Sequence, residues 1–303
     1  MMFAVRFGFT KHLRPSWLSS SKSNLSGISF STQAPIEPSI DVAAFQTTLT
    51  NLAPSISKSL NTKGYYSTPT PFDILPSNAI RIMRQQSINL RNQGRFEQSW
   101  SEKIDSSGIV TRFDKEGVFA CEPDGGDYDT APDVILYISV LLQTLPDLLN
   151  STDTDFGLSM SSFNAKLAVT SPGGSVYPLH IDNPQGISSG DTRKLTCIIY
   201  MNLDYQDGDG GELRIFCGKT SDEGCEKEEQ VVDIAPDGGM MILFWSDEIP
   251  HEVLPTAPDA DVSEEERDRY ALTVWIPTDH YHTIHNPSSK FAKLGEEAFP
   301  TKT

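Results

Sequence analysis

His180 and Asp182 are a pair of residues whose types and spacing could bind a metal ion. They are two positions apart, so on an extended strand both side chains would leave the same face. A second histidine, His251, and then Arg269 come later in the chain. Two imidazoles and one carboxylate on one side of a metal form the facial triad of non-haem Fe(II) sites, which leaves the opposite coordination positions open. The sequence therefore predicts a metal centre made by His180, Asp182 and His251.

The simpler interpretation of these residues is structural. A lone His-x-Asp is most often a surface or hydrogen-bonded pair, and Arg269 follows an acidic run that could be a solvated loop. The functional interpretation is favoured because the four residues occur together among predicted strands. Apolar residues also alternate after Arg269, which places it at the head of a core strand. Arg267 is the competing site arginine, although it belongs to the acidic run.

The segment from Asn164 onward predicts a β-rich fold. Short apolar stretches with a period of two are separated by Gly, Pro and Asp turns. The expected strands cover residues 165–170, 176–182, 194–203, 211–217, 231–235, 240–245, 251–255 and 269–276. Short strands at this spacing favour a sandwich or jelly roll, an architecture that closes or pairs its sheet edges.

The first half of the chain predicts mainly helices. Apolar residues recur every three or four positions, and Gly64 and Gly94 are natural stops. A third helix should begin near Asp133, and Pro146 should kink or end it. The expected elements are helices over 41–60, 76–93 and from 133 onward, and short strands over 64–67, 109–113 and 118–121 in otherwise turn-rich sequence. Helices followed by strands indicate an α+β fold in which N-terminal helices buttress a jelly roll.

These patterns divide the chain into a support region (41–160), a jelly-roll core (161–280) and an irregular tail (281–303). The histidines at the start of the tail could imitate a second metal site; they are His280, His282 and His285. No core strand is expected after them, so a solvated tail is the favoured interpretation.

Composition limits the possible partners and compartments. The chain has 303 residues and a formal net charge of −17, which argues against nucleic acid or an anionic membrane surface as a general partner. No unbroken apolar run has the length of a membrane span. The four cysteines form no Cys-x-x-Cys pair, which disfavours a zinc site or a disulfide framework and suits a reducing compartment.

Residues 1–36 differ from the rest of the chain. They are basic and rich in serine, and the first acidic residue is Glu37. This composition is typical of an organellar transit peptide, so a mitochondrial location is expected. An untargeted, disordered tail on a cytoplasmic protein is the alternative.

Several motifs occur in one order along the second half of the chain. They are His180-Ile181-Asp182-Asn183-Pro184, Leu195-Thr196-Cys197-Ile198-Ile199-Tyr200-Met201-Asn202, Gly210-Gly211-Glu212-Leu213-Arg214-Ile215-Phe216, Leu243-Phe244-Trp245-Ser246-Asp247, Pro250-His251-Glu252-Val253 and Arg269-Tyr270-Ala271-Leu272-Thr273-Val274-Trp275. With these motifs the chain resembles the 2-oxoglutarate-dependent prolyl 4-hydroxylases of the egl-nine type. The resemblance is strongest over 164–277 and more tenuous back to about residue 41.

The resemblance implies a double-stranded β-helix that binds Fe(II), 2-oxoglutarate and O₂, with ascorbate as reductant. It implies hydroxylation of a prolyl residue in a protein or peptide, with a possible role in oxygen sensing. His180, Asp182 and His251 would bind iron, and Arg269 would anchor the far carboxylate of 2-oxoglutarate, since a guanidinium offers a fork of donors. The other residues expected in the co-substrate pocket are Tyr200, Thr196, Ile198 and Tyr177.

The chain departs from the family pattern in three places. Where the family commonly has a tyrosine just before a Pro-Gly turn, this chain has Ser171-Pro172-Gly173-Gly174, with one residue fewer before Tyr177. The loops Asn183–Arg193 and Thr256–Asp268 also look longer than in the family. Rim loops select what a rigid scaffold binds, so two alternatives stay open. One is a 2-oxoglutarate oxygenase that acts on another side chain or a small molecule. The other is a non-catalytic jelly-roll binding module. The sequence makes no prediction of oligomeric state.

Overall fold

A computed structural model describes residues 37–104, 110–152, 156–174, 177–184, 186, 190–217, 230–257 and 267–284. The predicted transit segment 1–36, most of the acidic run before Arg267 and the tail from His285 onward lie outside these residues.

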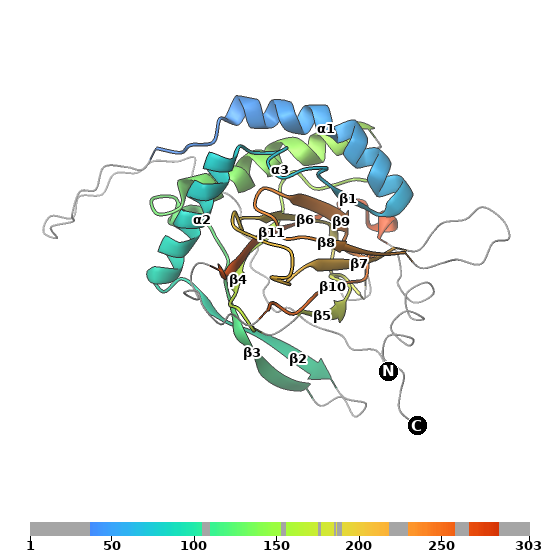
Figure 1. The fold of residues 1–303 in the computed structure, drawn as a ribbon. Coiled ribbons are helices and arrows are strands. Elements are labelled where there is room, and N and C mark those ends of the chain that lie inside the picture. The colour runs from blue at the N-terminus through green and yellow to red at the C-terminus, as the bar shows by residue number, and fades with distance from the viewer. Residues whose placement is uncertain are drawn as a thin grey trace, which may run out of the picture.

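Three helices cover one side of the structure (Figure 1): α1 Val42–Lys63, α2 Ser77–Asn92 and α3 Pro132–Thr152. The carboxylate of Asp41 caps the first turn of α1 by accepting the Ala44 N–H. Gly64 ends α1 with a φ of 79°, a left-handed conformation that glycine adopts without a steric penalty. The three helices were expected from their apolar periodicity, and the structure confirms them.

The third helix is longer than expected. Pro146 lies inside it rather than ending it, and the helix continues to Thr152. By length and composition, α3 is the one described helix that could cross a membrane. Its N-terminal turn holds the fully buried Asp133, whose carboxylate accepts hydrogen bonds from the backbone N–H of Ser39 and from Gln86. These contacts, together with its buried apolar residues, make α3 a core helix of this fold.

The strands form two antiparallel sheets. The larger sheet has the order β1-β9-β6-β11-β4-β3-β2, and the smaller sheet has the order β5-β10-β7-β8. The bounds are β1 Tyr65–Ser67, β2 Glu97–Ile104, β3 Val110–Cys121, β4 Asn164–Thr170, β5 Tyr177–His180, β6 Arg193–Tyr200, β7 Leu213–Cys217, β8 Gln230–Ile234, β9 Met241–Trp245, β10 His251–Val253 and β11 Arg269–Pro277. Two facing sheets with helices against one of them confirm the expected α+β jelly roll (Figure 1).

The prediction for the segment between α2 and α3 was right only in part, because both expected strands overlap β3 but β2 was missed. The sequence indicated turns and two short strands there, whereas the structure has a long hairpin of β2 and the 12-residue β3. The predicted strand 176–182 is also shorter, because β5 ends at His180 and Asp182 lies in the bend beyond it.

The two faces of the larger sheet have different roles. On β11, Leu272, Val274 and Ile276 are fully buried in the core that the sheet shares with the helices. Because side chains alternate along a strand, Arg269 and Trp275 leave the opposite face, toward the smaller sheet. The space between the two sheets therefore receives the polar residues of β11.

Candidate metal centre

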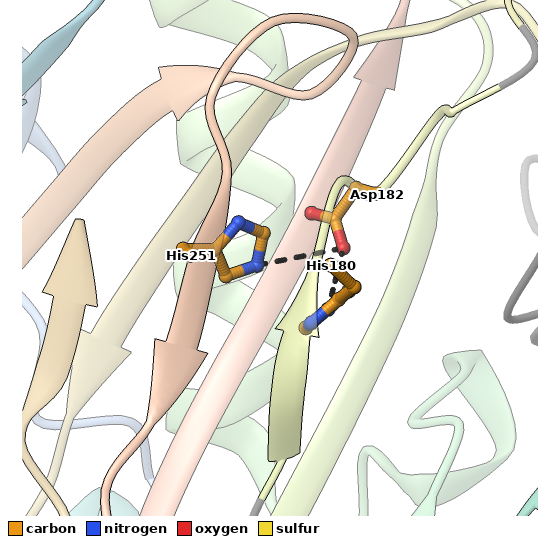
Figure 2. A group of neighbouring side chains, drawn as sticks. All are labelled: His180, Asp182 and His251. Carbon is orange, nitrogen blue, oxygen red and sulfur yellow. Dashed lines mark ion pairs between the residues drawn. The ribbon is translucent and has the colours of Figure 1, made fainter. Parts of the chain in front are cut away.

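His180 and His251 lie side by side on neighbouring strands. They are direct partners in the antiparallel pairing of β5 with β10, and their ring centroids are 4.3 Å apart. Asp182 reaches the same point from the bend after β5 (Figure 2). One ligand atom from each of the three residues lies within 4.8 Å of the others. The structure thus brings together the three residues that the sequence analysis selected.

Main-chain carbonyls set the tautomers of both histidines. Nδ1 of His180 is 2.8 Å from the carbonyl oxygen of Pro178, and Nδ1 of His251 is 3.0 Å from that of Ile249. A carbonyl only accepts, so each Nδ1 carries the proton and each Nε2 keeps its lone pair. The two Nε2 atoms lie 3.5 and 3.8 Å from Oδ1 of Asp182. All three free donor atoms therefore converge on one point.

The second oxygen of Asp182 is held by two side chains from the larger sheet. Oδ2 accepts hydrogen bonds from the Thr196 hydroxyl at 2.7 Å and from the Trp275 indole N–H at 2.9 Å. Because the Thr196 proton goes to the carboxylate, the Ser246 hydroxyl at 2.7 Å must donate to Thr196. This chain of hydroxyls leaves Oδ1 of Asp182 for a metal.

Two of these supporting residues, Trp275 and Ser246, were not singled out by the sequence analysis. Thr196 was expected in the co-substrate pocket, and in the structure its hydroxyl donates to Asp182. Thr196 and Trp275 are direct partners in the pairing of β6 with β11. That pairing explains how two residues far apart in the sequence donate hydrogen bonds to the same oxygen.

The electrostatics of the triad suit a divalent cation. Burial alone would raise the pKa of Asp182, but its neighbours His180, His251 and Arg193 hold it well below its usual value. Burial, with a smaller effect of His180, lowers the pKa of His251 to about 4. The site therefore presents an ionised carboxylate and, at His251, a neutral imidazole near neutral pH. This donor set of two nitrogens and one oxygen fits Fe(II).

Arg269 lies at the start of β11 and is buried. Its Nε donates to the carbonyl of Gly211 at 2.8 Å, and its Nη2 donates to the Tyr200 hydroxyl at 3.2 Å. A Cβ at Gly211, whose φ is +75°, would lie 2.9 Å from Cδ of Arg269, so only glycine fits there. Burial raises the pKa of Tyr200, which keeps its hydroxyl protonated. Ile198 lies between Thr196 and Tyr200 on β6 and is also buried.

The remaining predicted residues lie around this centre. Tyr177 begins β5, and its hydroxyl is buried without a hydrogen-bond partner among the described residues. Arg267, the competing arginine, forms an exposed ion pair with Asp209. His280 and His282 stack on each other at 5.6 Å and do not belong to the metal-binding group found among the described residues.

The loop that follows Asp182 is tied at its base. The Asn183 side chain donates to the carbonyls of Asp191 and Arg193, both at 3.0 Å. The Arg193 guanidinium donates to the carbonyl of Asp182 at 2.6 Å. Both ends of the loop are therefore fixed to the metal centre, while residues 187–189 lie outside the described part of the chain.

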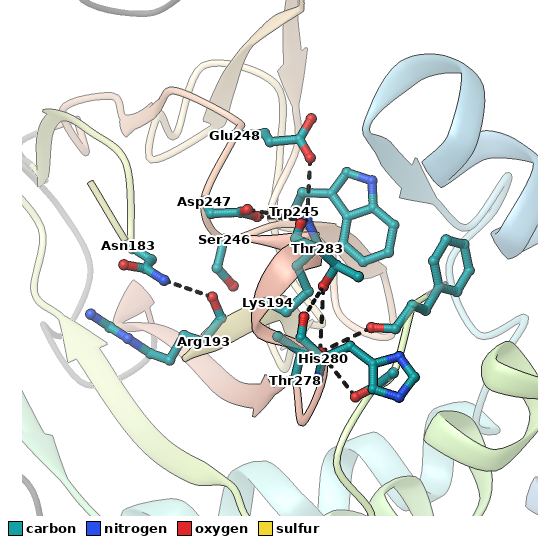
Figure 3. Close-up of polar contacts among 12 residues, drawn as sticks. Asn183, Arg193, Lys194, Trp245, Ser246, Asp247, Glu248, Thr278, His280 and Thr283 are labelled. Atoms are coloured by element: carbon teal, nitrogen blue, oxygen red, sulfur yellow. Dashed lines mark hydrogen bonds and ion pairs between the residues drawn. The ribbon is translucent and has the colours of Figure 1, made fainter. Parts of the chain in front are cut away.

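A buried ion pair supports the turn after β9 (Figure 3). Nζ of Lys194 lies 3.1 Å from each carboxylate oxygen of Asp247 and 3.3 Å from Glu248. It also donates to the carbonyl of Thr283 at 2.9 Å, which fastens the segment after β11 to the sheet. Since Ser246 precedes Asp247, this ion pair stabilises the turn that supports Thr196.

Comparison with known proteins agrees with this geometry. Residues 165–277 match the 2OG-Fe(II) oxygenase superfamily, in which 2OG is 2-oxoglutarate. This segment is a 2OG-Fe(II) oxygenase domain. Its co-substrate and metal are therefore 2-oxoglutarate and Fe(II), and His180, Asp182 and His251 are the residues whose geometry fits the metal.

Curated relatives are of the egl-nine type. The chain is 35% identical over 142 residues to human Egl nine homolog 1, a match that covers 46% of this chain and 28% of that protein. It is 32% identical over 154 residues to the Caenorhabditis elegans hypoxia-inducible factor prolyl hydroxylase, covering 50% of this chain and 18% of that protein. The chain thus spans only about a third or less of these relatives' length.

Solved structures share the fold. A prolyl hydroxylase from Trichoplax adhaerens, in complex with a hypoxia inducible factor oxygen degradation domain peptide fragment, has a TM-score of 0.59 at 24% identity. That match covers 80% of this chain and 96% of the other. A Pseudomonas putida prolyl-4-hydroxylase has a TM-score of 0.54 at 24% identity, covering 75% and 98%. At these identities the likeness concerns the fold.

Proposed function

We propose that this protein is an Fe(II)- and 2-oxoglutarate-dependent dioxygenase that hydroxylates a prolyl residue in a protein or peptide. The observation that carries the proposal is the convergence of two Nε2 atoms and one carboxylate oxygen between the two sheets, together with the buried Arg269 on the face of the larger sheet that turns toward this space. The similarity to prolyl hydroxylases supports the choice of proline as the acceptor.

His180, Asp182 and His251 would hold Fe(II) from one side. When bound, Fe(II) supplies the oxygen chemistry in which O₂ and 2-oxoglutarate yield succinate, CO₂ and one hydroxyl group on the acceptor. The protein fixes the ligands beforehand, because main-chain carbonyls orient both imidazoles and Thr196 and Trp275 orient the carboxylate.

Arg269 would bind the far carboxylate of 2-oxoglutarate. Two of its nitrogens are already committed to Gly211 and Tyr200, which fixes the plane of the guanidinium. The Tyr200 hydroxyl accepts from Arg269, so its own proton is available for the same carboxylate. Both residues are buried, and the exclusion of water strengthens such a charge-assisted contact.

Three further properties complete the proposal. Ascorbate would keep the iron reduced, and a role in oxygen sensing would follow from the use of O₂ as a substrate.

The basic, serine-rich segment 1–36 supports import into mitochondria. Sequencing the N-terminus of the protein from its native source tests the import: a mature start between about Ser19 and Pro38 supports it, and an intact Met1 or Met2 contradicts it.

The deciding experiment is incubation of the protein with Fe(II), 2-oxoglutarate, O₂ and proline-containing peptides, followed by mass spectrometry. Gain of one oxygen atom on proline, coupled to succinate, is the expected result. Succinate without any oxidised proline would favour an oxygenase for another acceptor. Binding of 2-oxoglutarate with no succinate in the presence of any peptide would favour a binding module and overturn the proposal.

A further inference from the structure

Two lysines of the larger sheet meet one tyrosine of the smaller sheet. Nζ of Lys115, on β3, lies 3.6 Å from the centroid of the Tyr177 ring. Nζ of Lys166, on β4, lies 5.5 Å from the same centroid. A single aromatic ring at the start of β5 therefore has two ammonium groups beside it, and we call these three residues the basic cluster.

The basic cluster lies next to the metal centre. Tyr177 begins the strand that ends at His180. Lys166 is the direct partner of Thr273 on β11, and Thr273 shares its face with Trp275, two positions on. Diagonal neighbours in antiparallel strands are typically about 7–8 Å apart. Since Trp275 donates to Asp182, the basic cluster lines the same space between the sheets.

The electrostatics of the basic cluster favour an anion. Lys115 is only 3% exposed, and its burial, together with the charge of Lys166, lowers its pKa to about 7. An anion placed between the two ammonium groups would relieve their repulsion and restore the charged form of Lys115. The whole chain carries a net charge of −17, so two adjacent lysines on the inner face oppose the general charge of the protein.

Tyr177 supplies an independent observation. Its hydroxyl is buried and makes no hydrogen bond within the described structure, although buried hydroxyls are normally paired. A bound carboxylate accepts hydrogen bonds through either oxygen and would pair with this hydroxyl as well as with the ammonium groups.

We propose that Lys115, Lys166 and Tyr177 form a subsite for a carboxylate of the acceptor, the side chain of an aspartate or glutamate close in sequence to the target proline. The subsite deepens the proposed function and rests on it. The co-substrate does not need these lysines, because Arg269 and Tyr200 already offer donors to its far carboxylate. The lysines also have structural contacts, such as the bond from Lys166 to the Ser99 hydroxyl at 3.3 Å, so the test must separate recognition from folding.

The test uses paired peptides that contain one proline and differ only by Glu or Gln at a single position near it. Binding to the Mn(II)- and 2-oxoglutarate-loaded protein is measured by calorimetry without O₂, and hydroxylation is measured separately with Fe(II) and O₂. For one position of the Glu or Gln residue relative to the proline, the Glu peptide should bind at least about tenfold more tightly than the Gln peptide, as expected for a hydrogen bond to a charged group. Lys115→Met and Lys166→Met should each reduce this ratio toward one.

Lys58→Met, which removes an exposed lysine of α1, is the matched control and should keep the full ratio. The ratio of the affinities for the Glu and Gln peptides does not depend on a general loss of folded protein, because both peptides are measured with the same protein sample. The subsite is overturned if the wild type shows no Glu preference at any position, or if the preference survives in both lysine variants. It is also overturned if free glutarate, but no peptide carboxylate, binds in a lysine-dependent way.

The two proposals fail separately. A lysine-dependent Glu preference in binding without hydroxylated proline would support the subsite and contradict the prolyl hydroxylase proposal. Hydroxylated proline without any preference for Glu over Gln would support the prolyl hydroxylase proposal and contradict the subsite.

Discussion

The hydroxyl of Thr196 offers the sharpest test of how the metal centre is held. Thr196→Val keeps the shape of the side chain and removes the 2.7 Å hydrogen bond to Oδ2 of Asp182. It also removes the acceptor of the Ser246 hydroxyl. Among the described residues, the indole N–H of Trp275 would then be the one donor left to that oxygen, so the carboxylate could turn away from the two imidazoles.

The size of the effect follows from the charge on the carboxylate. A hydrogen bond to a charged group contributes roughly 1.5–3 kcal/mol, and every 1.4 kcal/mol is about a tenfold change in affinity. Loss of an outer partner of a metal ligand typically costs about 10- to 100-fold in affinity. We therefore expect Thr196→Val to weaken Fe(II) binding by about one to two orders of magnitude.

The assay is an anaerobic titration with Fe(II), repeated with Mn(II) as an ion that resists oxidation, and followed by calorimetry. Thr68→Val is the matched control, because Thr68 is equally buried and its hydroxyl accepts the backbone N–H of Met241 far from the triad. The control should lose stability but keep its metal affinity. Wild-type affinity in Thr196→Val, or an equal loss in Thr68→Val, would refute the account given for Asp182.

Three other predictions concern charged residues. Arg269→Ala should raise the KM for 2-oxoglutarate by about 10- to 100-fold. Arg267→Ala, which breaks an exposed ion pair with Asp209, should leave this KM unchanged, and the reverse pattern would exchange the roles of the two arginines. Lys194→Met should lower the free energy of unfolding by about 3–5 kcal/mol, because it removes the ammonium group beside the fully buried carboxylate of Asp247. Adding Asp247→Asn should recover a large part of the lost stability in urea denaturation. The free energy of unfolding should rise from about pH 7 to about pH 10, since the unfolded chain keeps a proton on Lys115 that the folded chain has released. Lys115→Met should remove that share of the rise, and an unchanged slope would contradict the buried environment of this lysine.

The sequence predicted the jelly roll well because its strands carry a period-two pattern with turn residues between them. It failed for β2, because the sequence of Glu97–Ile104 is mostly polar and shows no apolar alternation. Pro146 was expected to kink or end its helix, and the helix does not end there. A proline removes one hydrogen bond and strains one turn, but packing of a buried helix can offset that cost. Local signals thus failed where tertiary contacts decide the outcome.

The metal ligands could be predicted because their residue types and order are specific. Their supporting residues could not, since Thr196 and Trp275 meet Asp182 only through the register of β6 with β11. Register depends on the packed sheet, and nothing in the separate strands specifies it. The sequence did not predict the basic cluster either, because its three residues come from three different strands and meet only in the folded sheets.

The main-chain carbonyls behind the two histidines have a consequence for how this centre can change over evolution. No single side-chain replacement elsewhere can remove the acceptors of His180 or His251, because both belong to the backbone. The carboxylate ligand depends instead on the side chains of Thr196 and Trp275, and a change in a single codon can replace either of them. The imidazole half of the site is thus robust to mutation, whereas metal affinity can be adjusted through the residues that hold Asp182.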